Sequence, residues 1–221
     1  YDDLHADVLH WGRKGWVDYI VPQVYWNIGH QAADYAELTQ WWGKHTPQKK
    51  AQLYIGQHAA RTMDGGQLEE KLALSRQNSS GNSWWSGEDL VKNYKGLGDS
   101  LITSYQTYRA LLPELHGALG KTKAPAAISL ILEDTNEDGH MILWDDYREP
   151  SDPESAFYYA VYAFPEGTRP DISDVRYLMS ISTNPYFILP SMERGMTYRY
   201  MVTAINRFWQ ESKPASIRIS Y

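Results

Sequence analysis

The fold is decided by the stretch WVDYIVPQVYW, residues 16–26. Residues 17–21 form a near-continuous apolar run, which is typical of buried parallel strands with helices on both faces of the sheet. The run leads into Pro22, Gln23, Tyr25 and Trp26. Ligands of α/β folds bind beyond the carboxyl ends of the strands. This end is therefore predicted to belong to a site for a flat, hydroxylated ligand.

The first half of the chain alternates helix and strand. The predicted elements are, in chain order, a helix over 4–11, a strand over 17–26, a helix from the capping box at Asp34 and Glu37, a strand over 51–58, a helix capped by Asp64 and Gln67, a strand over 82–85 and a helix over 97–108. This order predicts three βα units after a first helix, and hence a parallel α/β sheet.

The second half alternates polar and apolar residues at period two. The predicted strands are 128–132, 140–144, 157–164, 186–189, 197–206 and 215–221. Some seven short strands with turns between them predict a small β-sandwich. Residues 134–139 resemble the start of an EF-hand loop with Asp145 at its twelfth position, but both flanks are predicted strands and not helices. A hairpin turn explains the pattern, so neither a metal site nor a cofactor is expected.

Charge and composition mark the boundary between the two halves. Residues 1–124 carry 13 basic and 13 acidic residues, whereas residues 125–221 carry a net charge of −6. Small residues and a proline, GALGKTKAP, fill 117–125. We therefore predict one domain over 1–116, a linker over 117–124 and a second domain over 125–221.

Composition also excludes several classes of function. The net charge of −6 argues against a nucleic-acid partner. No apolar stretch approaches the ~20 residues of a membrane helix, and the absence of cysteine excludes disulfides, thiolate metal sites and a cysteine nucleophile. The chain has 9 Trp and 17 Tyr against 4 Phe. Rings with a polar group suit amphipathic partners, of which sugars are the obvious example.

Three motifs in the first half resemble one known family. DYIVPQVYW at 18–26, YIGQ at 54–57 and GLGDSL at 96–101 are similar, in order and spacing, to the glycosyl hydrolase-like 10 family of bacterial envelope proteins. The second half is similar to a fibronectin type III module through LW at 143–144, YAVY at 159–162 and YMVTAIN at 200–206. The resemblance implies a fold of class α/β plus all-β: the C-terminal part, three βα units, of a (β/α)8 TIM barrel, followed by a fibronectin type III-like β-sandwich.

The resemblance also implies a function and a location. It indicates a bacterial glycoside hydrolase that acts on a polysaccharide, with peptidoglycan glycan strands as one candidate substrate. The expected location is the cell envelope, as a secreted, periplasmic or lipid-anchored protein. A closed barrel needs eight strands and about 250 residues, so three strands cannot close. Either a missing N-terminal barrel half or self-association through the open sheet edges would have to complete the sheet, and we favour a fragment.

The candidate saccharide-binding residues follow the predicted strands. They are Gln23, Tyr25, Trp26, Asn27, Gln57, His58, Trp84 and Trp85. Strand alternation places Gln23 and Tyr25 on one face, lets only one of Gln57 and His58 point into the barrel mouth, and divides the two tryptophans between faces. Structural alternatives stay open: Trp26 packed under a helix, Gln23 bonded to buried backbone, and His58 as a structural hydrogen bonder.

Catalytic residues cannot be assigned from these strand ends. Most glycosidases use two carboxylates across the scissile bond, and none of the three ends carries Asp or Glu. Asp18 lies near the start of its strand, and Glu88 and Asp89 fit a helix start. The catalytic pair is therefore expected on the absent strands, and this chain alone is expected to be inactive. The rival hypotheses are a non-catalytic carbohydrate-binding or adhesion protein and a structural interaction module whose aromatic residues are all core.

Overall fold

The computed structural model describes residues 5–115, 122–135, 139–145, 148–191 and 194–221. The chain divides into two compact units: unit 1, with residues 1–107 and 116–120, and unit 2, with residues 108–115 and 121–221. Segment 108–115 groups with unit 2, whereas the residue pattern predicts it within the first domain. Leu111 packs against the outer core of unit 2, and the Leu115 amide donates to the Phe208 carbonyl oxygen at 2.9 Å.

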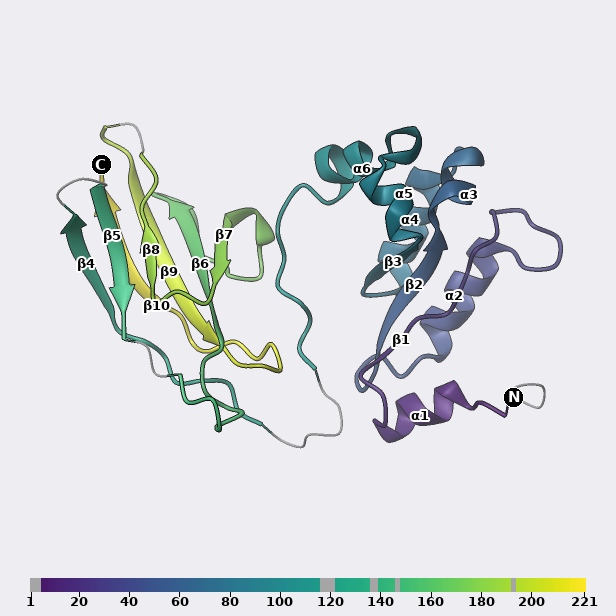
Figure 1. Ribbon diagram of the computed structural model, residues 1–221, viewed down its shortest axis with the longest axis horizontal. Helices are drawn as coiled ribbons and strands as arrows, with labels where there is room; N and C mark the ends of the chain where they lie inside the picture. Colours follow the sequence, from purple (N-terminus) through teal and green to yellow (C-terminus); the bar gives the residue numbers. More distant parts are fainter. Residues whose placement is uncertain (1–4, 116–121, 136–138, 146–147, 192–193) are drawn as a thin grey trace. The chain divides into compact units, whose positions relative to one another are not determined.

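Unit 1 holds a parallel sheet in the order β1-β2-β3 (Figure 1). Its elements are α1 (Val8–Lys14), β1 (Tyr19–Ile20), α2 (Tyr35–His45), β2 (Gln52–His58), α3 (Ala59–Asp64), α4 (Leu68–Asn78), β3 (Gly81–Trp85), α5 (Gly87–Val91), a 3-10 turn (Tyr94–Gly96), α6 (Leu97–Ser100) and a π-helical turn (Leu101–Tyr105).

The described helices cover one face of this sheet, and not both as the apolar run predicted. Two clusters form the covered side. The first joins β2 and the segment after β1 to α2 and α4 through Val24, Tyr35, Leu53, Ile55 and Leu74; the second joins β3 to α4, α5 and α6 through Leu72, Trp84, Leu90, Leu97 and Leu101. On the other face Tyr19 is 57% exposed, and Tyr54 and His58 are half-buried.

Three local expectations need correction. The first strand is shorter than 17–26, because Pro22 has no N–H for the ladder and pairing resumes only as a bridge between Gln23 and Gly56. Asp64 ends α3 and does not cap α4, since its carboxylate accepts from the Tyr94 hydroxyl at 3.0 Å and pairs with Lys95. The last predicted helix ends at Tyr105, as a short helix and a π-helical turn.

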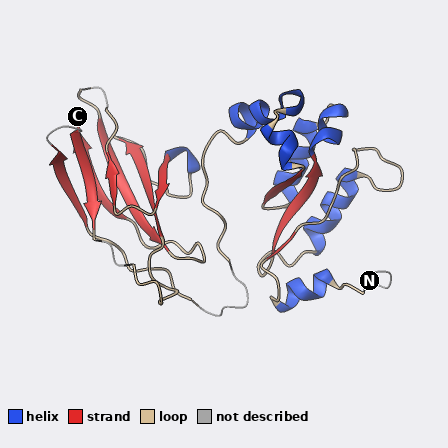
Figure 2. Cartoon of the chain, viewed as in Figure 1, coloured by secondary structure: helices blue, strands red, loops and turns tan. Residues whose placement is uncertain are grey.

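The regular secondary structure described in unit 2 is strand, apart from a 3-10 turn at Val175–Tyr177, and loops join the strands (Figure 2). The described strands are β4 (Leu130–Thr135), β5 (Gly139–Trp144), β6 (Tyr158–Pro165), β7 (Leu178–Ser182), β8 (Tyr186–Ile188), β9 (Thr197–Ile205) and β10 (Ala215–Ser220). They form a four-stranded sheet in the order β10-β9-β6-β7 and a three-stranded sheet in the order β4-β5-β8. Strand β7 has no counterpart among the predicted strands.

The two sheets enclose the core of unit 2. Trp144 and Tyr159 meet edge to face with ring centroids 5.2 Å apart, and Ile142, Tyr200 and Val202 complete the contact. The carboxylate-rich turn lies between β4 and β5, which pair antiparallel. Residues 136–138 of that turn lie outside the described residues. The flanking strands fit a hairpin and not the two helices of an EF-hand.

Candidate functional site

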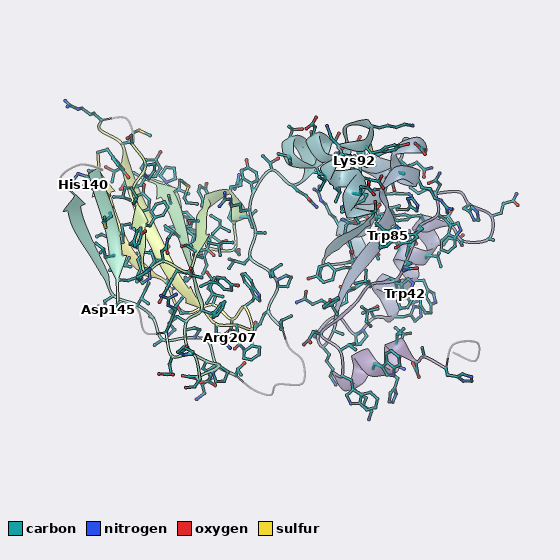
Figure 3. The ribbon with its side chains drawn as sticks, viewed as in Figure 1. Trp42, Trp85, Lys92, His140, Asp145 and Arg207 are labelled. Atoms are coloured by element: carbon teal, nitrogen blue, oxygen red, sulfur yellow. The ribbon has the colours of Figure 1, made fainter. Side chains whose placement is uncertain are left out.

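The carboxyl ends of the three parallel strands bring four predicted site residues to the uncovered face of the sheet. Gln23 pairs with Gly56, and His58 pairs with Trp85 in the next strand. Because side chains alternate along a strand, Gln23, Tyr25, His58 and Trp85 all project from the same face. Trp85, labelled in Figure 3, is 63% exposed. A continuous polar and aromatic surface results at this edge.

Tyr25 and His58 are in direct contact. Their ring centroids lie 5.6 Å apart at 87°, an edge-to-face pair. His58 also caps α3, because its Nδ1 accepts the Arg61 backbone N–H at 3.4 Å. With Nδ1 as acceptor, the neutral ring carries its proton on Nε2, which is then a hydrogen-bond donor. His58 thus acts as a structural hydrogen-bond acceptor through Nδ1, and its Nε2 is left for a contact to ligand.

Gly56 lets β1 and β2 approach each other below this surface. A Cβ at this position would lie 2.7 Å from the Pro22 carbonyl oxygen. The Gly56 N–H donates to that same oxygen at 2.9 Å, and its carbonyl accepts from Val24 N–H at 3.0 Å. The backbone bridge between Gln23 and Gly56, which orients Gln23, therefore depends on residue 56 having no side chain.

Two predicted site residues lie on the opposite, helix-covered face. Gln57 is fully buried and donates to Asn82 Oδ1 at 2.5 Å, while Trp84 packs in the cluster around Leu72 and Leu97. Gln57 Oε1 and the Trp84 indole nitrogen have no hydrogen-bond partner within the part of the chain that the structure describes. Both residues pack between the sheet and its helices and do not line the uncovered face.

Trp26 and Asn27 begin the loop between β1 and α2. The Trp26 ring lies 6.3 Å from the ring of His30 in the same loop. Asn27 is directed inward, because its Oδ1 accepts from Lys71 Nζ at 3.3 Å. A Cβ on Gly65 would lie 2.7 Å from Asn27 Nδ2, so the amide is tightly enclosed.

Sequence reasoning missed three contributors to this region. Tyr19 and Tyr54 lie on the same uncovered face, nearer the amino-terminal ends of β1 and β2, with ring centroids 6.0 Å apart. Burial, followed by proximity to Tyr19, raises the pKa of the Tyr54 hydroxyl. Period-two alternation from Tyr25 and His58 could have found both. Lys71 was also missed, although it lies three residues after Leu68 and one before Leu72, on the buried stripe of α4.

Carboxylates are absent from the three described strand ends. Glu88 pairs with Lys92, and Asp89 forms a capping box with Ser86 at the start of α5, as expected for a helix start. The peptide bond between Trp85 and Ser86 is cis. No group of three His, Asp or Glu side chains that could hold a metal ion occurs among the described residues. This surface can bind through stacking and hydrogen bonds, but it holds no acid–base pair.

Comparison with known proteins agrees with the sequence motifs. Residues 1–71 match the family model described as Glycosyl hydrolase-like 10. This segment is therefore similar to that family. The chain is also 30% identical over 227 residues to Glycosyl hydrolase YngK of Bacillus subtilis, an alignment that covers 96% of this chain and 43% of that protein. Glycosyl hydrolase DigH of Escherichia coli K12 is 41% identical over 56 residues, covering 25% of this chain and 13% of that protein. The chain thus spans less than half the length of these curated relatives.

The solved structures to which this chain is similar are distant. The structure of FN3tt mut matches with a TM-score of 0.31 and 16% identity, covering 44% of this chain and 97% of that one. Domains d3–d4 of the rat CD45 extracellular region match with a TM-score of 0.34 and 11% identity, covering 46% of this chain and 52% of that one. Within the described residues, no helix combines the length and the hydropathy needed to cross a membrane.

Proposed function

We propose that unit 1 supplies one side of the saccharide cleft of a glycoside hydrolase. The observation that carries this proposal is the gathering of Gln23, Tyr25, His58 and Trp85 on the uncovered face at the carboxyl ends of three parallel strands. Aromatic faces stack on the apolar faces of sugar rings, while the Gln23 amide and the His58 imidazole offer hydrogen bonds to hydroxyls. This is the edge at which barrel enzymes bind their substrates.

The catalytic carboxylates, in this proposal, come from other strands of a complete (β/α)8 barrel. The absence of Asp and Glu from the described strand ends supports this division, as does the 43% share of the Bacillus subtilis relative that the chain spans. The chain alone then binds a polysaccharide without cleaving it. We further propose that the substrate is a cell-envelope polysaccharide, with peptidoglycan glycan strands as the first to test, and that the protein is secreted, periplasmic or lipid-anchored.

Unit 2 fits a fibronectin type III-like module that acts as a spacer or docking domain. Its seven described strands fall into sheets of three and four, the division found in sandwiches of this type. Its largest buried rings, Tyr159, Tyr162 and Tyr200, fill its own interior. We therefore assign the saccharide site to unit 1.

The direct test measures glycan binding by the 221-residue chain through the quenching of its tryptophan fluorescence. Soluble peptidoglycan glycan strands and N-acetylglucosamine oligomers are the probes, with malto-oligosaccharides for comparison. We expect saturable quenching by the glycan. Trp85→Ala should lower the glycan affinity by about tenfold or more, since stacked rings dominate such sites. Trp41→Ala is the matched control, because Trp41 is 45% exposed but lies on α2. Equal loss in both variants, or no binding by the unaltered chain, would contradict the proposal.

Non-catalytic carbohydrate binding is the second candidate function. The absence of carboxylates from the three described strand ends favours it for this chain. The two functions differ in the full-length protein: a hydrolase releases reducing ends from the bound glycan, whereas a binding protein leaves the glycan intact. A reducing-end assay on the full-length protein therefore distinguishes them.

A further inference from the structure

Lys71 is the most unusual charged residue in unit 1. It is fully buried, and it is the only charged side chain with this burial in the part of the chain whose side chains are described. None of the ion pairs found among the described residues involves Lys71. Burying an ammonium group without a carboxylate is unfavourable, so a lysine at this place requires an explanation beyond packing.

The ammonium group is held by neutral partners from three elements. Nζ lies 3.3 Å from Asn27 Oδ1 in the loop after β1 and 3.3 Å from Thr62 Oγ1 in α3. It also lies 4.8 Å from the centroid of the Tyr35 ring in α2, a cation–π contact. Burial, followed by the positive charge of Arg61, lowers the pKa of Lys71 to about 8. Lys71 therefore links the first βα loop to the helices that follow β1 and β2.

The same loop is held at neighbouring points by α4 and its cap. Gln67 accepts the Ile28 N–H at 2.9 Å and donates to the Ile28 carbonyl at 3.3 Å. The Tyr35 N–H donates to the Asn27 carbonyl at 3.4 Å, and the Tyr35 hydroxyl donates to the Lys71 carbonyl at 3.2 Å. These bonds fix the loop backbone, whereas the Asn27 side chain is bonded by Lys71 Nζ, from which Thr62 Oγ1 also accepts.

The position of Asn27 affects the site because Asn27 follows two site residues in the chain. Asn27 directly follows Tyr25 and Trp26, so the position of its side chain limits where those two rings can lie. We propose that Lys71 is a positioning residue, whose ammonium group holds Asn27 and thereby sets Tyr25 and Trp26 for a saccharide. This inference rests on the proposed function for its ligand. The hydrogen bond between Lys71 and Asn27 does not depend on that function.

The test separates positioning from simple stability. Lys71→Met keeps the length of the side chain and removes the donors and the charge. Removing an unpaired buried charge should leave folding intact, while glycan affinity falls by about fivefold or more, a size common for residues that act through others. Asn27→Ala removes the acceptor instead, and the double variant should bind no more weakly than either single one, because the two residues act through one bond.

A readout without ligand completes the experiment. In Lys71→Met, the amide protons of Ile28 and Tyr35 should exchange faster than in the unaltered chain, while that of Ile55 in β2 should be unchanged. Unchanged loop exchange, or unchanged affinity despite faster exchange, would overturn the positioning role. If the unaltered chain binds no glycan, the proposed function of the site fails, and the exchange rates alone then decide whether Lys71 fixes the loop.

Discussion

Single residues on β1 and β2 determine whether the site can form. Gly56 has no side chain, and this lets the Pro22 carbonyl oxygen approach to accept its N–H. Tyr25 and His58 meet just beyond this point. The geometry of the aromatic surface therefore depends on a position that contributes no group to it.

Replacing Gly56 by alanine should destabilise unit 1 by about 1–3 kcal/mol, because the new Cβ would lie 2.7 Å from backbone that cannot easily move. Urea unfolding monitored by tryptophan fluorescence measures the change in stability. Gly87→Ala is the control, since a Cβ there meets nothing within 4 Å. Equal stability of both variants would show that β1 shifts without penalty.

Lys71 predicts an unusual dependence of stability on pH. Its pKa is about 8 in the folded chain and about 10.4 in an unfolded one, so the unfolded state binds more protons between these values. Stability should therefore rise as pH increases through this window, by on the order of 3 kcal/mol in total. In Lys71→Met this rise should be missing, and the variant should be at least as stable as the unaltered chain at pH 7.

Urea unfolding of the unaltered chain and of Lys71→Met at several pH values between 7 and 10.5 measures this difference in stability. Lys92→Met is the matched control, because the Lys92 side chain is 70% exposed. A parallel pH profile for the unaltered chain and Lys71→Met would contradict the prediction.

At the scale of elements, the start of α2 depends on one carboxylate. Asp34 accepts from the backbone N–H groups of Gly29, Ala36 and Glu37. Its slight burial raises the pKa of this carboxyl, but the three bonds outweigh that effect and hold the pKa below the usual value. Asp34 therefore both begins the helix and closes the loop that carries Trp26 and Asn27.

Asp34→Ala should lower stability at pH 7 by about 1 kcal/mol, the usual value of an N-cap. Because the pKa is lowered on folding, this contribution is present above pH 4 and disappears as the carboxylate is protonated. The two proteins should thus converge in stability at acid pH, as circular dichroism during thermal unfolding can show. Asp34→Ser retains a cap and should lose less; an equal loss would contradict capping as the cause.

At the scale of the whole molecule, unit 1 leaves parallel strands at both edges of its sheet. Strands β1 and β3 are the edges, and the uncovered face carries exposed Tyr19 and Trp85. Such edges pair with further strands. This feature fits the proposal that other strands complete the barrel.

The isolated chain should therefore self-associate as its concentration rises. Tyr19→Lys places a charge on the edge strand β1 and should reduce this association, whereas Gln40→Lys, exposed on α2, should not. Light scattering over a dilution series measures both. A monomer that is independent of concentration would contradict the prediction.

Residue patterns alone were enough to predict the local features of this chain. Caps, turn residues and the two periodicities act over a few residues, so the helix start at Asp34, the strand 51–58 and most strands of unit 2 could be predicted from residue patterns. The similarity of residues 1–71 to the glycosyl hydrolase-like 10 family could be predicted from the motifs for the same reason.

Which face of the sheet is buried, and so which residues remain accessible together, depends on contacts between distant segments. Gln57 and His58 are adjacent in sequence, yet one is buried behind the sheet and the other meets Tyr25, because the side on which the helices pack is set by contacts between distant segments. The same contacts bring Lys71 to Asn27, 44 residues earlier in the chain. Segment 108–115 packs with unit 2 through Leu111 for the same physical reason. Burial and partners depend on the whole fold, which residue patterns do not contain.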